Sequence, residues 1–378
     1  MSIVIKEIHS RNELKDFVKF QLELYKGNPY FVPPLIIDEI NGFDRKKNPA
    51  FKFAEPHYYL AYKNGKIVGR IAAIINKIEV NKLKVKKIRF GWLDMIDDIE
   101  VTKALFNRVE ELAKANGLEF MEGPMGASNL EKAGMLTEGF DQLSTAITYY
   151  NYEYYPKHLA ELGFVKEKEW VENIMTTPDS IPDKIYEFAK LVTERYGLKL
   201  LHFRDSSEMQ PYIKPIFDLL EESYKDLETY VPISEEQKAF YAKKYSKILN
   251  PDYINFIKDS EGELCAFAIT MPSYAKALQK ANGKLFPFGW YHLLQAQKKN
   301  DTVEFVLIGV HPKYQRKGIT SIIFKEMFET FKKHNIKHLE TNPELEGNQS
   351  VQALWKDYNP VQHKARKTFT KAIGNTIN

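Results

Sequence analysis

The sequence predicts an α/β protein with mixed (α+β) sheets, built from two tandem copies of one domain. In each half a strand is followed by helices, an antiparallel hairpin and a strand–loop–helix–strand crossover. Because the order of elements is the same in both halves, the pattern indicates an internal repeat. A chain of 378 residues is long enough for two such domains. The stretch TTPDSIPDK predicts the linker, and we assign the domains to 1–175 and 183–378.

The first half begins with a strand and a helix whose start signal is local. Ser10 is the expected N-cap, and Glu13 completes a capping box. The hairpin that follows a Pro-rich turn is expected to reverse at Asn64-Gly65, the pair that a type I′ turn prefers. The other expected elements of this half are the strands 2–8, 86–95 and 118–123 and the helices 10–24 and 99–116.

The second half repeats this order, with a hairpin that turns near Glu261-Gly262. Its other expected elements are the strands 198–203, 302–310 and 336–342 and the helices 208–224, 234–248 and 319–334. In the last of these helices apolar residues recur every four positions, at Ile319, Ile323, Met327 and Phe331. This period predicts a helix that packs one face on a sheet.

Composition and charge exclude several classes of protein. Hydrophobic residues make up 44% and charged residues 28% of the chain, as in ordinary soluble domains. A net charge of +4 is too small to indicate a nucleic-acid partner. The apolar stretch IVGRIAAII is too short to span a bilayer, and the first residues lack the apolar segment of a signal peptide, so we predict a cytoplasmic protein. Cys265 is interpreted as a buried apolar residue, and we expect no metal site.

The last stretch, VQHKARKTFTKAIGNTIN, contains no acid and four cations, Lys364, Arg366, Lys367 and Lys371. Together they equal the net charge of the whole chain. One interpretation is a solvated helix end. The other is a contact with cofactor phosphates or with anionic lipid headgroups, which would hold the protein peripherally at the inner face of the membrane.

The stretch VHPKYQRKGIT predicts an anion-binding turn between a strand and a helix. Pro312 ends the strand, Gly318 permits a positive φ or a close backbone approach, and a helix begins at Ile319. Backbone amides of such a turn and of the helix start attract anions. Arg316 and Lys317 add positive charge.

This turn resembles the pyrophosphate loop of the GNAT acyltransferases, Gln/Arg-x-x-Gly-x-Gly/Ala. The resemblance implies an acyl-CoA or acetyl-CoA donor held by the loop, by preceding strand amides that polarise the thioester, and by an Asn after the next strand. These residues are Ile308, Gly309, Val310, Gln315, Arg316, Lys317, Gly318, Ile319, Thr320 and Asn348. Thr320 departs from the family's Gly or Ala, but its hydroxyl adds a donor, and we interpret the loop as functional rather than as a remnant.

The resemblance also implies the catalytic residues. Glu304 stands at the spacing of the family's general base, which takes a proton from the attacking amine. A structural ion pair with a neighbouring Lys or Arg is the alternative role. Where the family often has a Tyr general acid this chain has Trp355, which cannot donate usefully, and Tyr358 is the candidate substitute.

The first half lacks this loop. Asp97 and Asp98 stand where the amides should face a phosphate, and carboxylates there cap the helix and repel an anion. We therefore expect the first domain to be a degenerate copy that does not bind CoA. The Gly-containing stretch 122–140 of this half is either a functional loop or an irregular crossover.

A wider resemblance rests on the segments FGWLDMIDD, EGPMG, AGMLTEGF and YYPKHLAELGF. They are similar to a bacterial N-acyltransferase family that includes ceramide synthases, and the similarity spans most of the chain. It implies transfer of an acyl group from acyl-CoA to a primary amine of a sphingoid-type lipid. The alternatives are a small-amine N-acetyltransferase that uses acetyl-CoA and a non-catalytic GNAT-fold ligand-binding protein. A tRNA-dependent transferase is disfavoured, because such enzymes lack an intact CoA loop.

Overall fold

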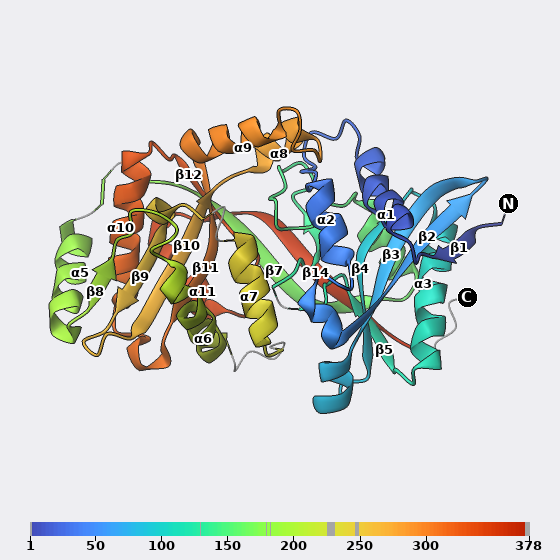
Figure 1. The fold of residues 1–378 in the computed structure, drawn as a ribbon, viewed down its shortest axis with the longest axis horizontal. Coiled ribbons are helices and arrows are strands. Elements are labelled where there is room, and N and C mark those ends of the chain that lie inside the picture. Colours follow the sequence, from blue (N-terminus) through green and yellow to red (C-terminus); the bar gives the residue numbers. More distant parts are fainter. Residues whose placement is uncertain are drawn as a thin grey trace. The chain divides into compact units, whose positions relative to one another are not determined.

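A computed structural model describes residues 2–128, 130–178, 180–181, 183–224, 231–245 and 249–374. Contacts divide the chain into two compact units, which Figure 1 draws as ribbons. Unit 1 comprises Met1–Val171, Tyr274–Leu293 and His363–Asn378, and unit 2 comprises Glu172–Ser273 and Leu294–Gln362. The predicted domain limits, 1–175 and 183–378, follow the repeat along the sequence rather than the packing, and they stay a prediction.

Unit 1 contains a mixed sheet in the order β1-β2-β3-β4-β5-β14, with β6 beside β14. Its strands are β1 (Val4–Glu7), β2 (Ala54–Lys63), β3 (Lys66–Asn76), β4 (Lys87–Met95), β5 (Phe120–Gly123), β6 (Met135–Glu138) and β14 (Val361–Ala372). Its helices are α1 (Arg11–Leu24), α2 (Ile36–Phe43), α3 (Ile99–Ala115), α4 (Tyr154–Glu161) and α8 (Ala275–Ala281). The pair β4–β5 is parallel, so α3 is the crossover between them.

Unit 2 repeats this order as β8-β9-β10-β11-β12-β7, with β11–β12 as the parallel pair and α10 as the crossover. Its strands are β7 (Val165–Thr176), β8 (Lys199–Leu201), β9 (Ile254–Lys258), β10 (Leu264–Pro272), β11 (Thr302–Val310), β12 (His338–Thr341) and β13 (Glu344–Leu345). Its helices are α5 (Asp183–Tyr196), α6 (Ile213–Tyr224), α7 (Glu235–Tyr245), α10 (Ile319–Lys333) and α11 (Gln349–Gln352). α9 (Gly289–Lys298) crosses the boundary, as do β7 and β14. The matching strand orders confirm the predicted tandem α/β architecture.

Local signals placed several elements correctly. Ser10 and Glu13 form the capping box of α1. The β2–β3 turn has φ of 53° at Asn64 and 76° at Gly65, both in the left-handed region that a type I′ turn requires. The predicted apolar face of α10 is buried. Residues 246–248 of the helix expected over 234–248, and residues 375–378 of the tail, lie outside the described residues.

The interpretation of the basic tail as a solvated helix end is wrong. It forms strand β14 rather than a helix end, and Lys364, Arg366 and Lys371 are at most 7% exposed. Lys371 Nζ donates to the Leu162 carbonyl at 2.6 Å, and burial lowers the pKa of this lysine. These buried cations form no exposed basic patch, so a headgroup contact through this tail finds no support. The charge pattern of this tail is typical of an exposed segment. The prediction failed because β14 pairs with strands that are distant in the sequence, and this pairing buries the cations.

Candidate active site

The start of α10 has the geometry of an anion site. Its N-cap, Gly318, has a φ of 81°, and no side chain caps the helix. A Cβ at Gly318 would lie 2.7 Å from the ring of Phe188, so glycine is required for both the conformation and the space. The first amides of a helix have no intrahelical carbonyl to bond, and together with the helix dipole they favour a negatively charged ligand.

Cations and aromatic rings surround this helix start. An open hollow of about 440 Å³ is lined by residues of the loop, Arg316, Lys317, Gly318 and Thr320, and by residues of α5, Phe188, Leu191, Val192, Arg195 and Tyr196. The Lys317 ammonium lies 5.3 Å from the ring centre of Tyr196 and 5.5 Å from that of Tyr314, which holds its charge beside the hollow. Four of the predicted loop residues are thereby brought together. Thr320, in the first turn of α10, lines this hollow as well.

Two predicted loop residues are directed elsewhere. Ile319 is 2% exposed and packs in the apolar core of unit 2, so it can offer only its backbone amide. Gln315 is exposed, and its side chain turns back to donate to the Val310 carbonyl at 3.2 Å. This bond closes the turn between β11 and α10.

Beyond Phe305, β11 extends past its parallel partner. The β11–β12 register ends at Phe305 opposite Thr341, whereas β11 continues to Val310. Asn342 follows β12, and its side chain donates to the Val306 carbonyl at 2.9 Å, beyond the last paired residues of the two strands. The register with β10 also shifts here. The predicted residues Ile308, Gly309 and Val310 all lie on this extension.

Glu304 lies one residue before the end of that parallel pairing. It is 1% exposed, and its Oε1 accepts a hydrogen bond from Ser273 Oγ at 2.7 Å. Across the strands its partners are Met271 and Glu340. The neighbouring Phe305 packs with α10, so Glu304 points to the opposite face of the sheet. A buried carboxylate in this position is suited to accept a proton from a substrate on that face.

Tyr358 lies on the other face. Its ring contacts those of Phe324 and Phe328 on α10, with ring centres 5.5 and 4.9 Å away. The structure therefore does not bring Tyr358 and Glu304 together. Asn348 is the N-cap of α11, where its side chain accepts from the Val351 amide at 3.4 Å. Its local role is to start that short helix.

Trp355 is a core residue. It is 1% exposed, packs on Phe305 and Phe324, and donates from Nε1 to Glu344 Oε1 at 2.7 Å. Burial raises the pKa of Glu344 to about 7, although the indole hydrogen bond acts in the opposite direction. This pairing of an indole with a buried acid explains why Trp355 fits where a proton donor was expected.

The equivalent helix start in unit 1 is closed by carboxylates, as predicted. Asp98 is the N-cap of α3 and accepts from the Glu100 amide at 3.0 Å. Lys63 pairs with the other oxygen of Asp98 at 2.7 Å, and this hydrogen bond lowers the pKa of the acid. Asp97 lies 3.2 Å from the Nε2 of His158. An anionic ligand would meet negative charge at this site.

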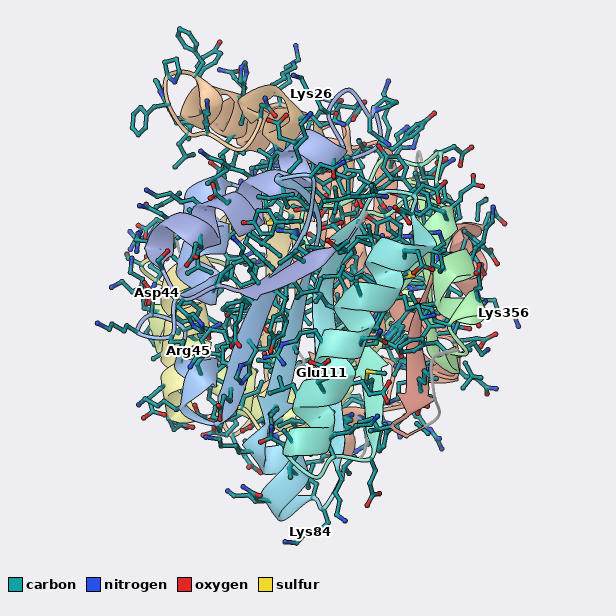
Figure 2. The ribbon with its side chains drawn as sticks, turned by 90° about the vertical axis from the view of Figure 1, so that its right-hand side faces the viewer. Lys26, Asp44, Arg45, Lys84, Glu111 and Lys356 are labelled. Atoms are coloured by element: carbon teal, nitrogen blue, oxygen red, sulfur yellow. The ribbon has the colours of Figure 1, made fainter. Side chains whose placement is uncertain are left out.

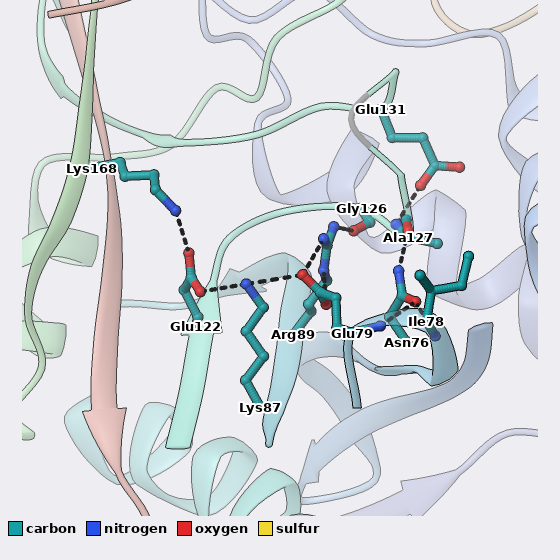
Figure 3. Close-up of polar contacts among 10 residues, drawn as sticks. All are labelled: Asn76, Ile78, Glu79, Lys87, Arg89, Glu122, Gly126, Ala127, Glu131 and Lys168. Carbon is teal, nitrogen blue, oxygen red and sulfur yellow. Dashed lines mark hydrogen bonds and ion pairs between the residues drawn. The ribbon is translucent and has the colours of Figure 1, made fainter. Parts of the chain in front are cut away.

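The Gly-containing stretch of unit 1 is held by a buried charged network (Figure 3). Arg89 binds Glu79 through two nitrogens, at 2.7 and 2.8 Å, and donates to the Gly126 carbonyl at 2.8 Å. Lys87 bridges Glu79 and Glu122 at 3.0 and 2.7 Å. Residues 121–128 are buried, so this crossover is a packed part of the unit.

Comparison with known proteins supports the tandem fold and places part of the chain in a known family model. Residues 214–358 match the model of the Acetyltransferase (GNAT) family. The tandem GNAT protein from the clavulanic acid biosynthesis pathway matches 99% of this chain and 100% of its own, with a TM-score of 0.57 and 12% identity. Protein YghO of Escherichia coli (strain K12) is 27% identical over 98% of this chain and 95% of its own length. The chain has a tandem GNAT fold, and these matches support an N-acyltransferase activity.

A second relative that matches along the full length is the bacterial ceramide synthase of Caulobacter vibrioides (strain NA1000 / CB15N). It is 24% identical over 96% of this chain and 95% of its own length. A GCN5-related N-acetyltransferase from Sphaerobacter thermophilus matches 98% of this chain and 96% of its own in fold, with a TM-score of 0.53 and 8% identity. Within the part of the chain that the structure describes, no helix is long and apolar enough to cross a membrane.

Sequence reasoning missed three residues beside this site. Arg195 and Phe188 reach the loop from α5, an element that the linker assignment left without a prediction. Ser273 donates to Glu304 from the end of β10. The apolar spacing of 183–196 was a usable signal for the helix, whereas the contact of Ser273 depends on strand pairing that no local pattern encodes.

Proposed function

We propose that the acyltransferase moves an acyl group from acyl-CoA to the primary amine of a long-chain sphingoid-type base. The observation that supports acyl-CoA use is the uncapped start of α10, with Gly318 in the left-handed conformation and cations at its rim. The acceptor is proposed from the full-length relative that is named as a bacterial ceramide synthase. The protein would then work in the cytoplasm.

The loop residues are suited to hold the pyrophosphate of the donor. The amides that follow Gly318 would donate to phosphate oxygens, and Arg316 and Lys317 would neutralise their charge. The cation of Arg195, on α5, lines the same hollow. Bound acyl-CoA supplies the activated acyl group as a thioester, and the extension of β11 through Ile308, Gly309 and Val310 offers amides to polarise its carbonyl. Asn348 stays a predicted contact of the donor.

Glu304 is proposed as the general base. An amine is protonated at neutral pH, because ammonium groups have pKa values near about 10, and it must lose a proton before or during attack. Glu304 would accept one proton from the ammonium, so that the neutral amine can attack. The C–N bond then forms as the C–S bond breaks, and the second proton that nitrogen loses balances the one that the departing sulfur gains. The hydrogen bond from Ser273 fixes the orientation of the carboxylate. Tyr358, whose ring packs on α10 away from Glu304, stays the predicted donor of a proton to the departing thiolate, and Tyr358→Phe tests that role.

The experiment is an assay of purified protein with sphinganine and either palmitoyl-CoA or acetyl-CoA, with the amide product detected by mass spectrometry. We expect N-palmitoyl product, and we expect Glu304→Gln to lose it. Product from acetyl-CoA alone would favour the small-amine N-acetyltransferase alternative. Thiol release without any amide would contradict transfer to this acceptor, and an absence of donor binding would favour the non-catalytic alternative.

A further inference from the structure

The turn between α8 and α9 and the first part of α9 expose a group of large apolar side chains. Phe286 is 77% and Phe288 68% exposed, and Trp290, Tyr291 and Leu294 are each between 46% and 48% exposed. Isolated exposed apolar residues are ordinary, but five in nine consecutive positions mark an interaction surface. We call these five residues the aromatic turn. In Figure 2 the side chains of the orange-tinted helical segment at the top of the view project outward.

This turn is built rigidly. The Trp290 amide donates to the Leu285 carbonyl at 2.9 Å, and Trp290 Nε1 donates to the Pro287 carbonyl at 2.8 Å. A Cβ at Gly289 would lie 2.0 Å from the Lys284 carbonyl oxygen, so the chain is tightly closed there. Local hydrogen bonds therefore fix the backbone of this turn in the conformation that exposes the rings.

The helix before the turn is anchored in unit 1. Leu278 of α8 is buried in a cluster with Val32. The Gln279 side chain donates to the Pro29 and Phe31 carbonyls at 2.8 and 3.0 Å. The Ile36 amide donates to the Gly283 carbonyl at 2.9 Å. The segment that precedes the aromatic turn is thus fixed to unit 1 by packing and hydrogen bonds.

The charged residues of this stretch have one sign. The stretch 272–300 contains five lysines and no acid. The lysines are Lys276, Lys280, Lys284, Lys298 and Lys299, and all are exposed. Exposed Phe and Leu with Trp and Tyr beside them, in a field of lysines, match the interface of an anionic bilayer, where aromatic rings sit at headgroup level and lysines attract acidic lipids.

We propose that the aromatic turn docks this enzyme on the surface of an anionic lipid membrane. Phe286 and Phe288 would enter the boundary between headgroups and acyl chains, and the lysines would lie on the headgroups. None of these five residues is among the proposed catalytic or donor-binding residues, and the proposal does not require that the acceptor be a sphingoid base. A second copy of the chain is the other occupant that the test must separate.

The test is co-sedimentation of the full chain with vesicles, without substrates. Vesicles of phosphatidylcholine containing 30% phosphatidylglycerol are compared with phosphatidylcholine alone, and Phe286→Ser/Phe288→Ser is compared with wild type. The matched control is Leu83→Ser/Val165→Ser, which removes two apolar side chains that are 50% and 62% exposed elsewhere in unit 1. Thiol release from acyl-CoA with a water-soluble amine reports that the fold and the active site are intact.

We expect wild type and control to bind the anionic vesicles, and the double Phe variant to bind at least tenfold more weakly with unchanged thiol release. Raising salt should weaken binding, because the screening length falls from about 10 Å at 0.1 M to about 3 Å at 1 M. Equal binding by wild type and the Phe variant would overturn the proposal, as would no binding by either. A wild-type dimer that the Phe variant dissociates, with vesicle binding unchanged, would assign the surface to a second copy and also overturn it. Vesicle binding without any acyl transfer would leave this inference standing and remove the proposed function.

Discussion

The starts of α3 and α10 are the same structural feature with opposite chemistry. Each follows the central strand of a unit and leads into the crossover helix of a parallel pair. At α3 the N-cap is Asp98, whose carboxylate bonds the helix amide and Lys63. At α10 the N-cap is Gly318, which brings no side chain. The helix start of unit 2 is therefore uncapped, whereas that of unit 1 is capped by a carboxylate of its own.

The central strands differ in the same way. Across the parallel pairs, Arg89 faces Glu122 as Glu304 faces Glu340, so Arg89 occupies in unit 1 the place of the proposed base. Arg89 is committed to Glu79 and to the Gly126 carbonyl (Figure 3). On the proposed mechanism, unit 1 has an ion-paired cation at the position where unit 2 has its proton acceptor. The comparison teaches that two copies of one fold can carry opposite charges at matching positions.

The largest expected effect is on the chemical step. Glu304→Gln keeps the shape of the side chain and its bond with Ser273 but removes the proton acceptor. We expect kcat to fall by roughly 10²- to 10⁴-fold, the usual contribution of a general base, with KM for acyl-CoA within about twofold. Steady-state kinetics with acyl-CoA and an accepted amine measures this. Glu344→Gln, at another buried acid of unit 2, is the control and should keep kcat. If Glu304→Gln were fully active, Glu304 would not be the base, and its difference from Arg89 in unit 1 would carry no catalytic meaning.

Next is the effect of giving α10 the cap of α3. Gly318→Asp adds a carboxylate and a Cβ, whereas Gly318→Ala adds the Cβ alone. We expect the Kd for acetyl-CoA to rise roughly 100-fold or more in the Asp variant. In the Ala variant we expect a rise that is about tenfold smaller, because the Cβ brings strain at a positive φ but no charge repulsion. Competition with a fluorescent CoA analogue gives both values. If the two variants were equal, charge at the helix start would not explain the difference between the units.

The raised pKa of Glu344 should make the stability of the protein fall as pH rises, opposite to the effect expected below for Asp98. The pKa of Glu344 is raised to about 7, so the native state holds its proton between its ordinary pKa and pH 7 while the unfolded chain does not. This acid therefore costs stability as pH rises through that window. Glu344→Gln should stabilise the protein at pH 8 by on the order of 2 kcal/mol and much less at pH 5. Thermal unfolding at the two pH values decides, and an equal gain at both would contradict the raised pKa.

The smallest expected effect is at the cap of unit 1. Asp98→Ala should lower the free energy of unfolding by about 1 kcal/mol through the lost cap and leave the acetyl-CoA affinity unchanged. The lowered pKa of Asp98 means that its stabilisation is present above its ordinary pKa and is lost as pH falls through the lowered value. Denaturant unfolding of wild type, Asp98→Ala and Asp98→Asn, which keeps a capping oxygen, measures it. A change in CoA affinity would show that α3 takes part in donor binding.

Local chemistry carried the correct predictions. Each of these signals acts within a few residues: the capping box of Ser10 and Glu13, the turn at Asn64-Gly65 and the apolar period of α10. In the same way, Gly318 predicted an uncapped helix start and Asp98 a capped one. Features that depend on distant pairing were not predictable. Strand β14 buries Lys364 and Arg366, Trp355 finds Glu344, and Phe188 reaches Gly318 only after α5 has packed on α10. Such contacts follow from packing that one sequence does not reveal.

The central claim is that one of the two helix starts binds the donor, and isothermal titration of the whole chain with acetyl-CoA tests it most directly. We predict one site per chain, lost in Gly318→Asp and retained with the same affinity in Asp98→Ala. Two sites per chain, or binding that persists in Gly318→Asp, would contradict the account, because donor binding would then not depend on the open start of α10.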